Sequence, residues 1–95
     1  MCPFFIITSG CVNKLKPNRE YLLARSAYEA AVNAEAARYA PNLYHKAERY
    51  FKRAEELYEE RRFEKSMVYF EKSRGYAERS EHVARVKQFK SGDLE

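Results

Sequence analysis

The sequence is poor in the residues that interrupt helices. Its 95 residues include three glycines and three prolines, and two of the prolines, Pro3 and Pro17, precede residue 18. From that point the chain is rich in Ala, Glu, Lys, Arg, Leu and Tyr, a composition that favours helix over strand. We therefore expect an all-α fold without a β-sheet.

Cysteine and long apolar runs are also scarce. The two cysteines, Cys2 and Cys11, both precede the expected helices, so a disulfide framework within the helical domain is not indicated. No run of about 18 apolar residues occurs, and the sequence therefore predicts no transmembrane helix. A chain of this length forms one domain, whose core contributes about 3–5 kcal/mol of stability.

Neither sign of charge dominates. The 18 basic and 14 acidic residues give a formal net charge of +4, and the mean hydropathy is -0.75. Opposite charges are interleaved on the expected helices, as Glu48 and Lys52 are, which is typical of a solvated surface linked by ion pairs. No cluster of one sign is obvious, so we do not expect nucleic acid as the partner. A weak nucleic-acid-binding helical protein stays as a third alternative.

Residues that carry catalysis or hold cofactors are not arranged as in known sites. His45 and His82 are the only histidines, and each has one glutamate about a helical turn away, Glu48 and Glu78. A metal site needs three or four converging ligands, and no glycine-rich phosphate loop is present. We expect exposed surface histidines, no metal, no cofactor and no enzymatic activity.

Two amphipathic stripes dominate the second half of the chain. Both repeat at intervals of three or four residues, as one face of an α-helix does. The first stripe comprises Leu43, Ala47, Tyr50, Ala54 and Leu57. The second comprises Phe63, Met67, Phe70, Ser73, Ala77, Ser80 and Ala84. Because both stripes must be covered, we predict helices over residues 42–61 and 63–89 that fold back on each other as an αα-hairpin.

A third helix is predicted over residues 19–39, with a stripe made almost entirely of alanine. The stripe comprises Leu23, Ala27, Ala30, Ala34 and Ala37. It buries little area, so it can pack only against bulky partners, which the Tyr and Phe residues of the later helices supply. Pro41 disfavours helix at Ala40, and we expect a new helix to begin there, with one kinked helix as the alternative.

The predicted fold is therefore an all-α, three-helix bundle. The helical domain covers residues 19–89 and is followed by a flexible tail over residues 90–95. Before it, residues 1–11 are apolar and residues 12–18 are polar and contain Pro17. We expect residues 12–18 to act as a short tether.

Tyrosine is abundant, with eight residues and no tryptophan. Five of these tyrosines cannot all lie on the core stripes: Tyr28, Tyr44, Tyr58, Tyr69 and Tyr76. An exposed cluster of them is a candidate contact surface. Alternatively, they cover the edges of a thin core with their hydroxyl groups in water.

The hairpin resembles a single tetratricopeptide repeat (TPR). The residues that fall at its signature positions are Tyr50, Ala54, Leu57, Phe63, Ser66, Phe70 and Ser73. Arg61 stands where the repeat usually has a turn glycine, and one repeat cannot form a solenoid groove. This resemblance implies the alternative function, a cytoplasmic TPR-like protein–protein adaptor.

The N-terminal segment, residues 1–11, resembles the end of a bacterial lipoprotein signal peptide. Its apolar run leads into Thr8-Ser9-Gly10-Cys11, and the last three of these residues match a lipobox. Thr8 replaces the preferred aliphatic residue, and no Lys or Arg stands near Met1. The resemblance implies that Cys11 is the lipidation site. Alternatively, the segment is ordinary chain and Cys11 has no role.

Residues 11–89 as a whole resemble the bacterial small-lipoprotein domain of unknown function 4398 family. The resemblance rests on Cys11, the alanine stripe, Tyr39-Ala40-Pro41 and the aromatic Phe63 after the turn. It implies a place in the cell envelope, on the periplasmic side, and supplies no activity. We therefore expect a non-enzymatic, lipid-anchored module that contacts an unknown protein or cell-wall partner, with self-association left open.

Overall fold

Helices occupy nearly all of residues 18–91, the part of the chain that the computed structural model describes. They are α2 (Asn18–Asn33), α3 (Ala36–Tyr39), α4 (Pro41–Glu59) and α5 (Phe63–Ser91). No strand occurs among these residues, so the expected all-α fold is confirmed. The predicted signal segment, most of the tether and the last four residues of the expected tail lie outside the described part.

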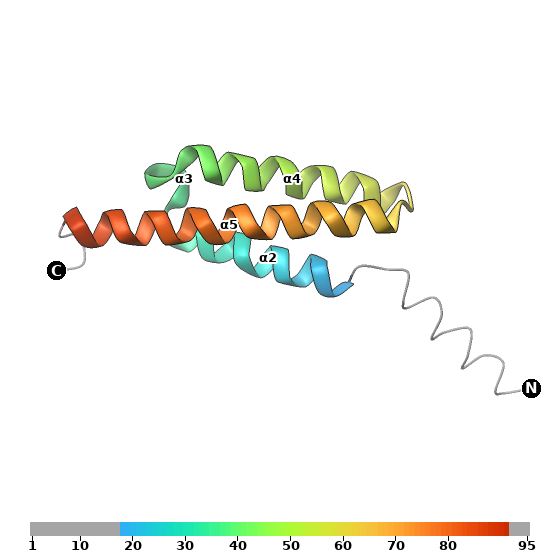
Figure 1. The fold of residues 1–95 in the computed structure, drawn as a ribbon, viewed down its shortest axis with the longest axis horizontal. Helices are drawn as coiled ribbons and strands as arrows, with labels where there is room; N and C mark the ends of the chain where they lie inside the picture. Colours follow the sequence, from blue (N-terminus) through green and yellow to red (C-terminus); the bar gives the residue numbers. More distant parts are fainter. Residues whose placement is uncertain (1–17, 92–95) are drawn as a thin grey trace, which may run out of the picture.

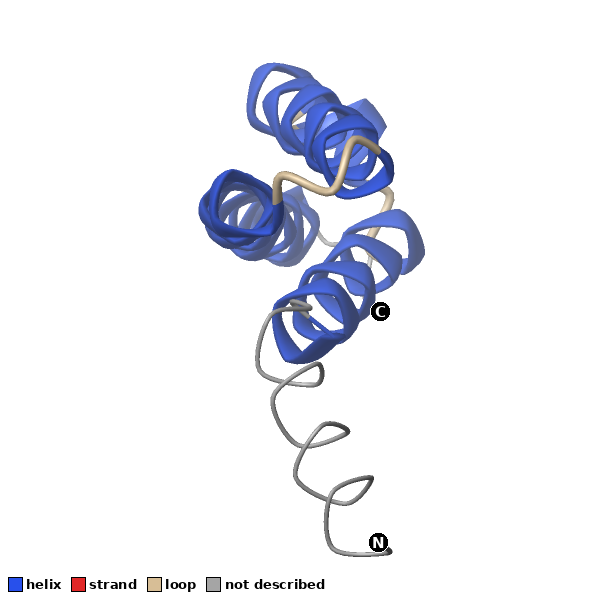
Figure 2. Ribbon diagram, turned by 90° about the vertical axis from the view of Figure 1, so that its right-hand side faces the viewer, coloured by secondary structure: helices blue, strands red, loops and turns tan. Residues whose placement is uncertain are grey.

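The longest helix, α5, is the one on which the other two long helices pack. Figure 1 shows α4 along one side of α5 and α2 along the other, with α2 and α5 running in the same direction and α4 running against them. Figure 2 views the bundle from its end and shows the three helices as separate rods around a common centre. Because α2 and α4 have few backbone contacts with each other, side chains bridge the space between them.

Small side chains bring α4 and α5 close together. Ala47 and Ala54 of α4 are fully buried, and each faces a serine of α5. The Oγ of Ser66 donates a hydrogen bond to the carbonyl oxygen of Ala54 at 3.0 Å, and that of Ser73 donates to the carbonyl oxygen of Ala47 at 2.8 Å. A side chain as short as serine reaches the main chain of a neighbouring helix only when the two backbones approach closely. The predicted hairpin is therefore confirmed.

Pro41 begins a new helix, as expected, and stands in the first turn of α4. There its missing N–H costs no hydrogen bond, because the first four N–H groups of a helix have no partner within it. The predicted single helix over residues 19–39, however, is wrong. The chain leaves helical geometry at Glu35, whose φ of 58° is left-handed, and the short α3 follows.

The break between α2 and α3 depends on side chains from the far end of the sequence. The Nε2 of Gln88 donates a hydrogen bond to the carbonyl oxygen of Ala34 at 2.8 Å, and the Nζ of Lys87 donates to that of Tyr39 at 2.7 Å. Both carbonyls belong to helix ends, where intrahelical partners are absent. Glutamate at position 35 does not predict a helix end, so only the contact with α5 explains this break.

The buried face of α2 is rotated from the predicted stripe. Ala27 and Ala34 are buried as expected, whereas Leu23 and Ala30 are half-buried and Ala37 is exposed. The buried alanines are Ala24, Ala27, Ala31, Ala34 and Ala36. Up to Ala34 both sets satisfy the three-and-four spacing, so periodicity alone cannot choose between them, and Ala36 follows the break. The observed rotation lets the tyrosines of α2 reach Phe51 of α4.

The core contains few large side chains. Among the described residues, Phe70 and Leu57 are the only large apolar side chains that are fully buried, and the remaining buried positions are alanine or serine. Half-buried aromatic side chains pack around this centre. Packing of the α2 alanines against α5 is therefore essential to the fold.

We predict that Ala31→Leu destabilises the protein by about 1–3 kcal/mol, because Ala31 is fully buried among alanines of α4 and α5 and a larger side chain overpacks that site. Ala37→Leu is the matched control, since Ala37 is exposed. Urea unfolding followed by circular dichroism measures both. Equal stability of the two variants would show that α2 does not dock as described.

We predict that Gly75→Ala stabilises the protein by about 1 kcal/mol, the difference in helix propensity between the two residues. Gly75 lies inside α5, and an added Cβ meets no atom within 4 Å. The expected result is a higher urea midpoint with an unchanged slope. Val68→Ala, at an exposed position of α5, is the control, and a lower midpoint for Gly75→Ala would contradict the open space beside this glycine.

Candidate functional site

The aromatic side chains of α4 divide between two sides of the helix. Tyr50 and Phe51 are consecutive, so their side chains leave the helix about 100° apart. Phe51 points toward α2, where its ring centroid lies 5.9 Å from that of Tyr21 and 5.8 Å from that of Tyr28. Tyr50 instead meets two tyrosines of α5. The two sides carry two separate aromatic groups.

The first group fills the opening between α2 and α4, and we call it the aromatic groove. It comprises Tyr21, Tyr28, Tyr44, Phe51 and Phe70. The rings of Tyr28 and Tyr44 stack 5.5 Å apart, and their hydroxyl oxygens lie 3.0 Å from each other. Two adjoining hollows of about 350 and 440 Å³ border the rings. The rings of the aromatic groove connect α2 to α4 where the two backbones make few contacts.

The hydroxyl group of Tyr28 is held in its protonated form. Partial burial, followed by the hydrogen bond with Tyr44, raises the pKa of Tyr28 well above its usual range. Both effects disfavour the phenolate. Tyr28 therefore serves as a neutral hydrogen-bonding group between two helices.

The second group lies where α4 and α5 meet, away from α2, and we call it the tyrosine seam. Its rings belong to Tyr50, Tyr69 and Tyr76, and its cations to Lys46, Lys72 and Arg79. Tyr50 and Tyr76 stack 5.5 Å apart with an interplanar angle of 3°, and Tyr69 lies 5.8 Å from Tyr50 at 57°. All three tyrosines are half-buried, so their outer edges face solvent.

Basic side chains cover the rings of the seam. The Nζ of Lys46 lies 5.4 Å from the ring centroid of Tyr76, and the guanidinium carbon of Arg79 lies 5.3 Å from the same centroid. The Nζ of Lys72 lies 5.6 Å from each of the two other ring centroids. At these distances the negative face of a tyrosine attracts the cation. A hollow of about 290 Å³ beside Tyr50 has further basic side chains, Arg49 and Arg53, in its lining.

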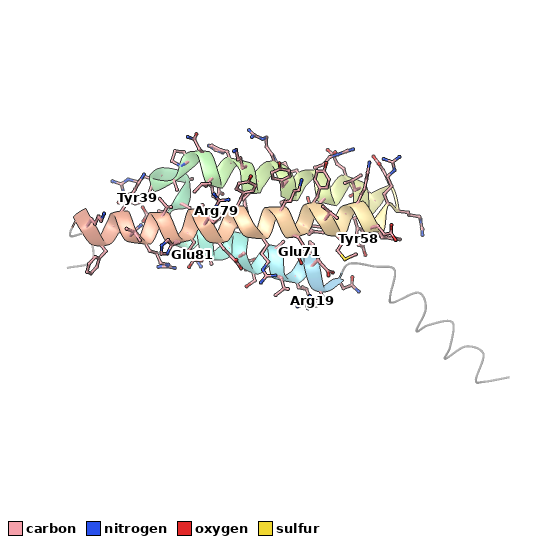
Figure 3. All side chains as sticks on the ribbon, viewed as in Figure 1. Arg19, Tyr39, Tyr58, Glu71, Arg79 and Glu81 are labelled. Carbon is pink, nitrogen blue, oxygen red and sulfur yellow. The ribbon has the colours of Figure 1, made fainter. Side chains whose placement is uncertain are left out.

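The three cations of the seam have no carboxylate partner among residues 18–91. Elsewhere on the helices, arginine pairs with nearby glutamate, as Arg74 does with Glu78 at 3.1 Å. No ion pair of the described residues involves a seam cation, and the positions three and four residues from each carry no Asp or Glu. In Figure 3, Arg79 lies between α5 and α4, while Glu71 and Glu81 lie along the edge of α5 nearer α2. Positive charge therefore gathers on one side of the hairpin.

The five tyrosines predicted as a contact surface occupy three places. Tyr28 and Tyr44 lie in the aromatic groove, and Tyr69 and Tyr76 lie in the tyrosine seam. Tyr58 packs edge-on against Phe63 at the turn between α4 and α5, with ring centroids 5.3 Å apart. All five are half-buried. The predicted lipidation site, Cys11, lies outside the described residues.

The histidines of the described chain do not gather with other ligands. The Nδ1 of His45 lies 3.4 Å from the carboxylate of Glu48, and His82 borders an apolar hollow lined by Leu43 and Val83. Among residues 18–91, no three His, Cys, Asp or Glu side chains lie close enough to hold a metal ion. Over the same range, no helix has the length and apolar character needed to cross a bilayer.

Tyr50 and the cations beside it are absent from the predicted contact surface. The core stripe of the hairpin includes Tyr50, and no one-signed cluster is obvious when each helix is read alone. A signal is nonetheless present in α5, where Lys65, Lys72 and Arg79 recur at intervals of seven residues. Such a spacing places side chains on nearly one line along a helix.

The comparison with protein families finds a match for this chain. Comparison with curated proteins finds no match, and comparison with solved structures finds none either. The family described as "Domain of unknown function (DUF4398)" matches residues 19–91, which extend from the first turn of α2 to the end of α5. The match covers most of the chain and confirms the resemblance seen in the sequence. The chain belongs to the DUF4398 family, a domain of unknown function.

Proposed function

We propose that this chain is a non-enzymatic module of the bacterial cell envelope, held to a membrane by acyl chains on Cys11 and acting through contact with a protein or cell-wall partner. The observation that carries the proposal is the tyrosine seam. It combines half-buried tyrosines with cations that no carboxylate neutralises. Tyrosine and arginine are enriched among the residues that dominate binding energy at interfaces.

The aromatic groove supports a contact role over a catalytic one. Its rings are engaged with each other across α2, α4 and α5, so they hold the bundle together. The aromatic groove stabilises the fold on one side of α4, and the tyrosine seam on the other side remains available for a partner.

The sequence before α2 supports a membrane anchor. Ser9, Gly10 and Cys11 match a lipobox, and two acyl chains suffice to hold a protein at a bilayer, whereas one gives marginal binding. Residues 12–17, fully extended, span at most roughly 20 Å. A lipidated Cys11 would therefore keep the bundle within a short reach of the membrane surface.

A cytoplasmic TPR-like adaptor is the alternative. It would use the same α4–α5 hairpin and the same seam, with residues 1–11 as ordinary chain. The two proposals differ in cellular location and in the covalent state of Cys11. A measurement of cellular location therefore distinguishes the two proposals more directly than a binding measurement does.

We predict that the full native gene, expressed in a bacterium with any upstream start, yields protein that begins at an acylated Cys11 and sediments with membranes. Mass spectrometry of the N-terminal peptide and fractionation of the cells measure the two properties. Cys11→Ser should abolish acylation and release the protein from the membrane fraction.

Cys2→Ser is the matched control, because Cys2 precedes the apolar run and is expected to be removed with it. It should leave both the acylation and the membrane fraction unchanged. Intact, unmodified protein in the cytoplasm would rule out the envelope proposal and favour the TPR-like adaptor.

A further inference from the structure

We propose that the tyrosine seam, together with exposed apolar side chains beside it on α5, binds the surface of an anionic lipid bilayer. The inference goes beyond the proposed function, because it assigns a lipid surface to the seam in place of a protein or cell-wall partner. It rests on the proposed function only for bringing the domain near a membrane. The binding itself would come from residues of α4 and α5. Its partner is a lipid surface, not a protein.

The first argument is the arrangement of the cations. Lys72 and Arg79 are one heptad apart on α5, and Lys65 extends the same line by one heptad toward the turn. Lys46 lies across the seam on α4, over the ring of Tyr76. None of these four residues takes part in an ion pair of the described chain. Unpaired cations on one side of a protein attract the headgroups of anionic lipids.

The second argument is the apolar side chains that continue the same surface. Val86 lies one heptad after Arg79 and is 37% exposed. Val68, four residues before Lys72 and therefore its neighbour on the helix surface, is 51% exposed. Exposed apolar side chains thus lie before Lys72 and after Arg79 on this side of α5.

An apolar hollow adds to this surface near the end of the seam. It has a volume of about 370 Å³, and its apolar lining comes from Leu43 of α4 and Val83 of α5. Arg79, Glu78 and His82 form its polar rim. A cation beside an apolar hollow suits a lipid, whose headgroup is charged and whose chain is not.

A bilayer fits this combination better than a dissolved polyanion does. A nucleic acid would pair with the cations but would leave Val68 in water. The ring faces that its bases would need for stacking are already covered by other rings and by cations. At a bilayer, cations reach headgroups, tyrosine hydroxyls lie at the interface, and apolar side chains enter the acyl boundary.

The test is flotation of the whole chain, made without acylation, with phosphatidylcholine vesicles that contain or lack phosphatidylglycerol. We expect binding to the anionic vesicles that weakens as salt is added, and less binding to the neutral ones. Lys72→Gln should weaken anionic binding about fivefold, the effect of one basic residue at such a surface. Lys52→Gln is the matched control: it removes the same charge from α4 next to Phe51, away from the seam, and should leave binding unchanged.

A second pair of variants tests the apolar contribution. Val68→Ser should weaken vesicle binding about fivefold, whereas Leu22→Ser, which removes a 62% exposed side chain from α2, should have no effect. Both side chains are exposed, so neither change should disturb folding, which circular dichroism verifies.

Three results would overturn the inference: equal binding to neutral and anionic vesicles, equal losses in Lys72→Gln and Lys52→Gln, or displacement from vesicles by mixed-sequence DNA. The last result would instead favour the nucleic-acid alternative. Because the protein in this assay carries no acyl chain, failure here is separate from failure of lipidation at Cys11.

Discussion

The close approach of α4 and α5 is the constraint on which the rest of the structure depends. It exists because alanine and serine occupy the facing positions, and because the hydroxyl of Ser73 can donate to the carbonyl oxygen of Ala47 across the interface. Two helices at this separation leave no room between them for tyrosine. The aromatic residues of the hairpin are therefore placed along the edges of the contact, where they remain half-buried.

The two edges of the contact between α4 and α5 differ in what covers them. On one edge, Phe51 and Tyr44 meet the tyrosines of α2, and the hydrogen bond between Tyr28 and Tyr44 completes the contact. On the other edge no fourth helix of the described chain covers Tyr50 and its neighbours. In this bundle of three long helices one aromatic edge is therefore not covered by a helix. Lysine and arginine side chains of α4 and α5 lie over its rings instead.

The features that could be predicted from the sequence are those that depend on local chemistry. The hairpin follows from the spacing of its two stripes, and the start of α4 follows from the fixed geometry of Pro41. The end of α2 could not be predicted, because the carbonyl oxygen of Ala34 accepts its hydrogen bond from Gln88, more than fifty residues further along the sequence. The rotation of α2 could not be predicted either, since two sets of alanines satisfy the same period up to Ala34 and only packing against α5 and α4 selects one of them. The tyrosine seam could not be predicted either, because the sequence does not show which face of α4 meets α5.

The distribution of charge indicates that the tyrosine seam has a role besides packing α4 against α5. Lys72 and Arg79 each directly follow a glutamate in the sequence, yet neither has a carboxylate three or four residues away, where helical side chains can meet. Arg74, on the same helix, has glutamate at both of those spacings and binds both. Lys52, next to Phe51 on α4, also has glutamates within one turn on either side. Other basic residues of these helices, such as Arg49 and Lys52, also take part in no ion pair of the described chain. The seam cations differ from them in lying over tyrosine rings. Their separation from acidic residues, on the one edge that no helix covers, is the arrangement expected if that edge meets an anionic surface.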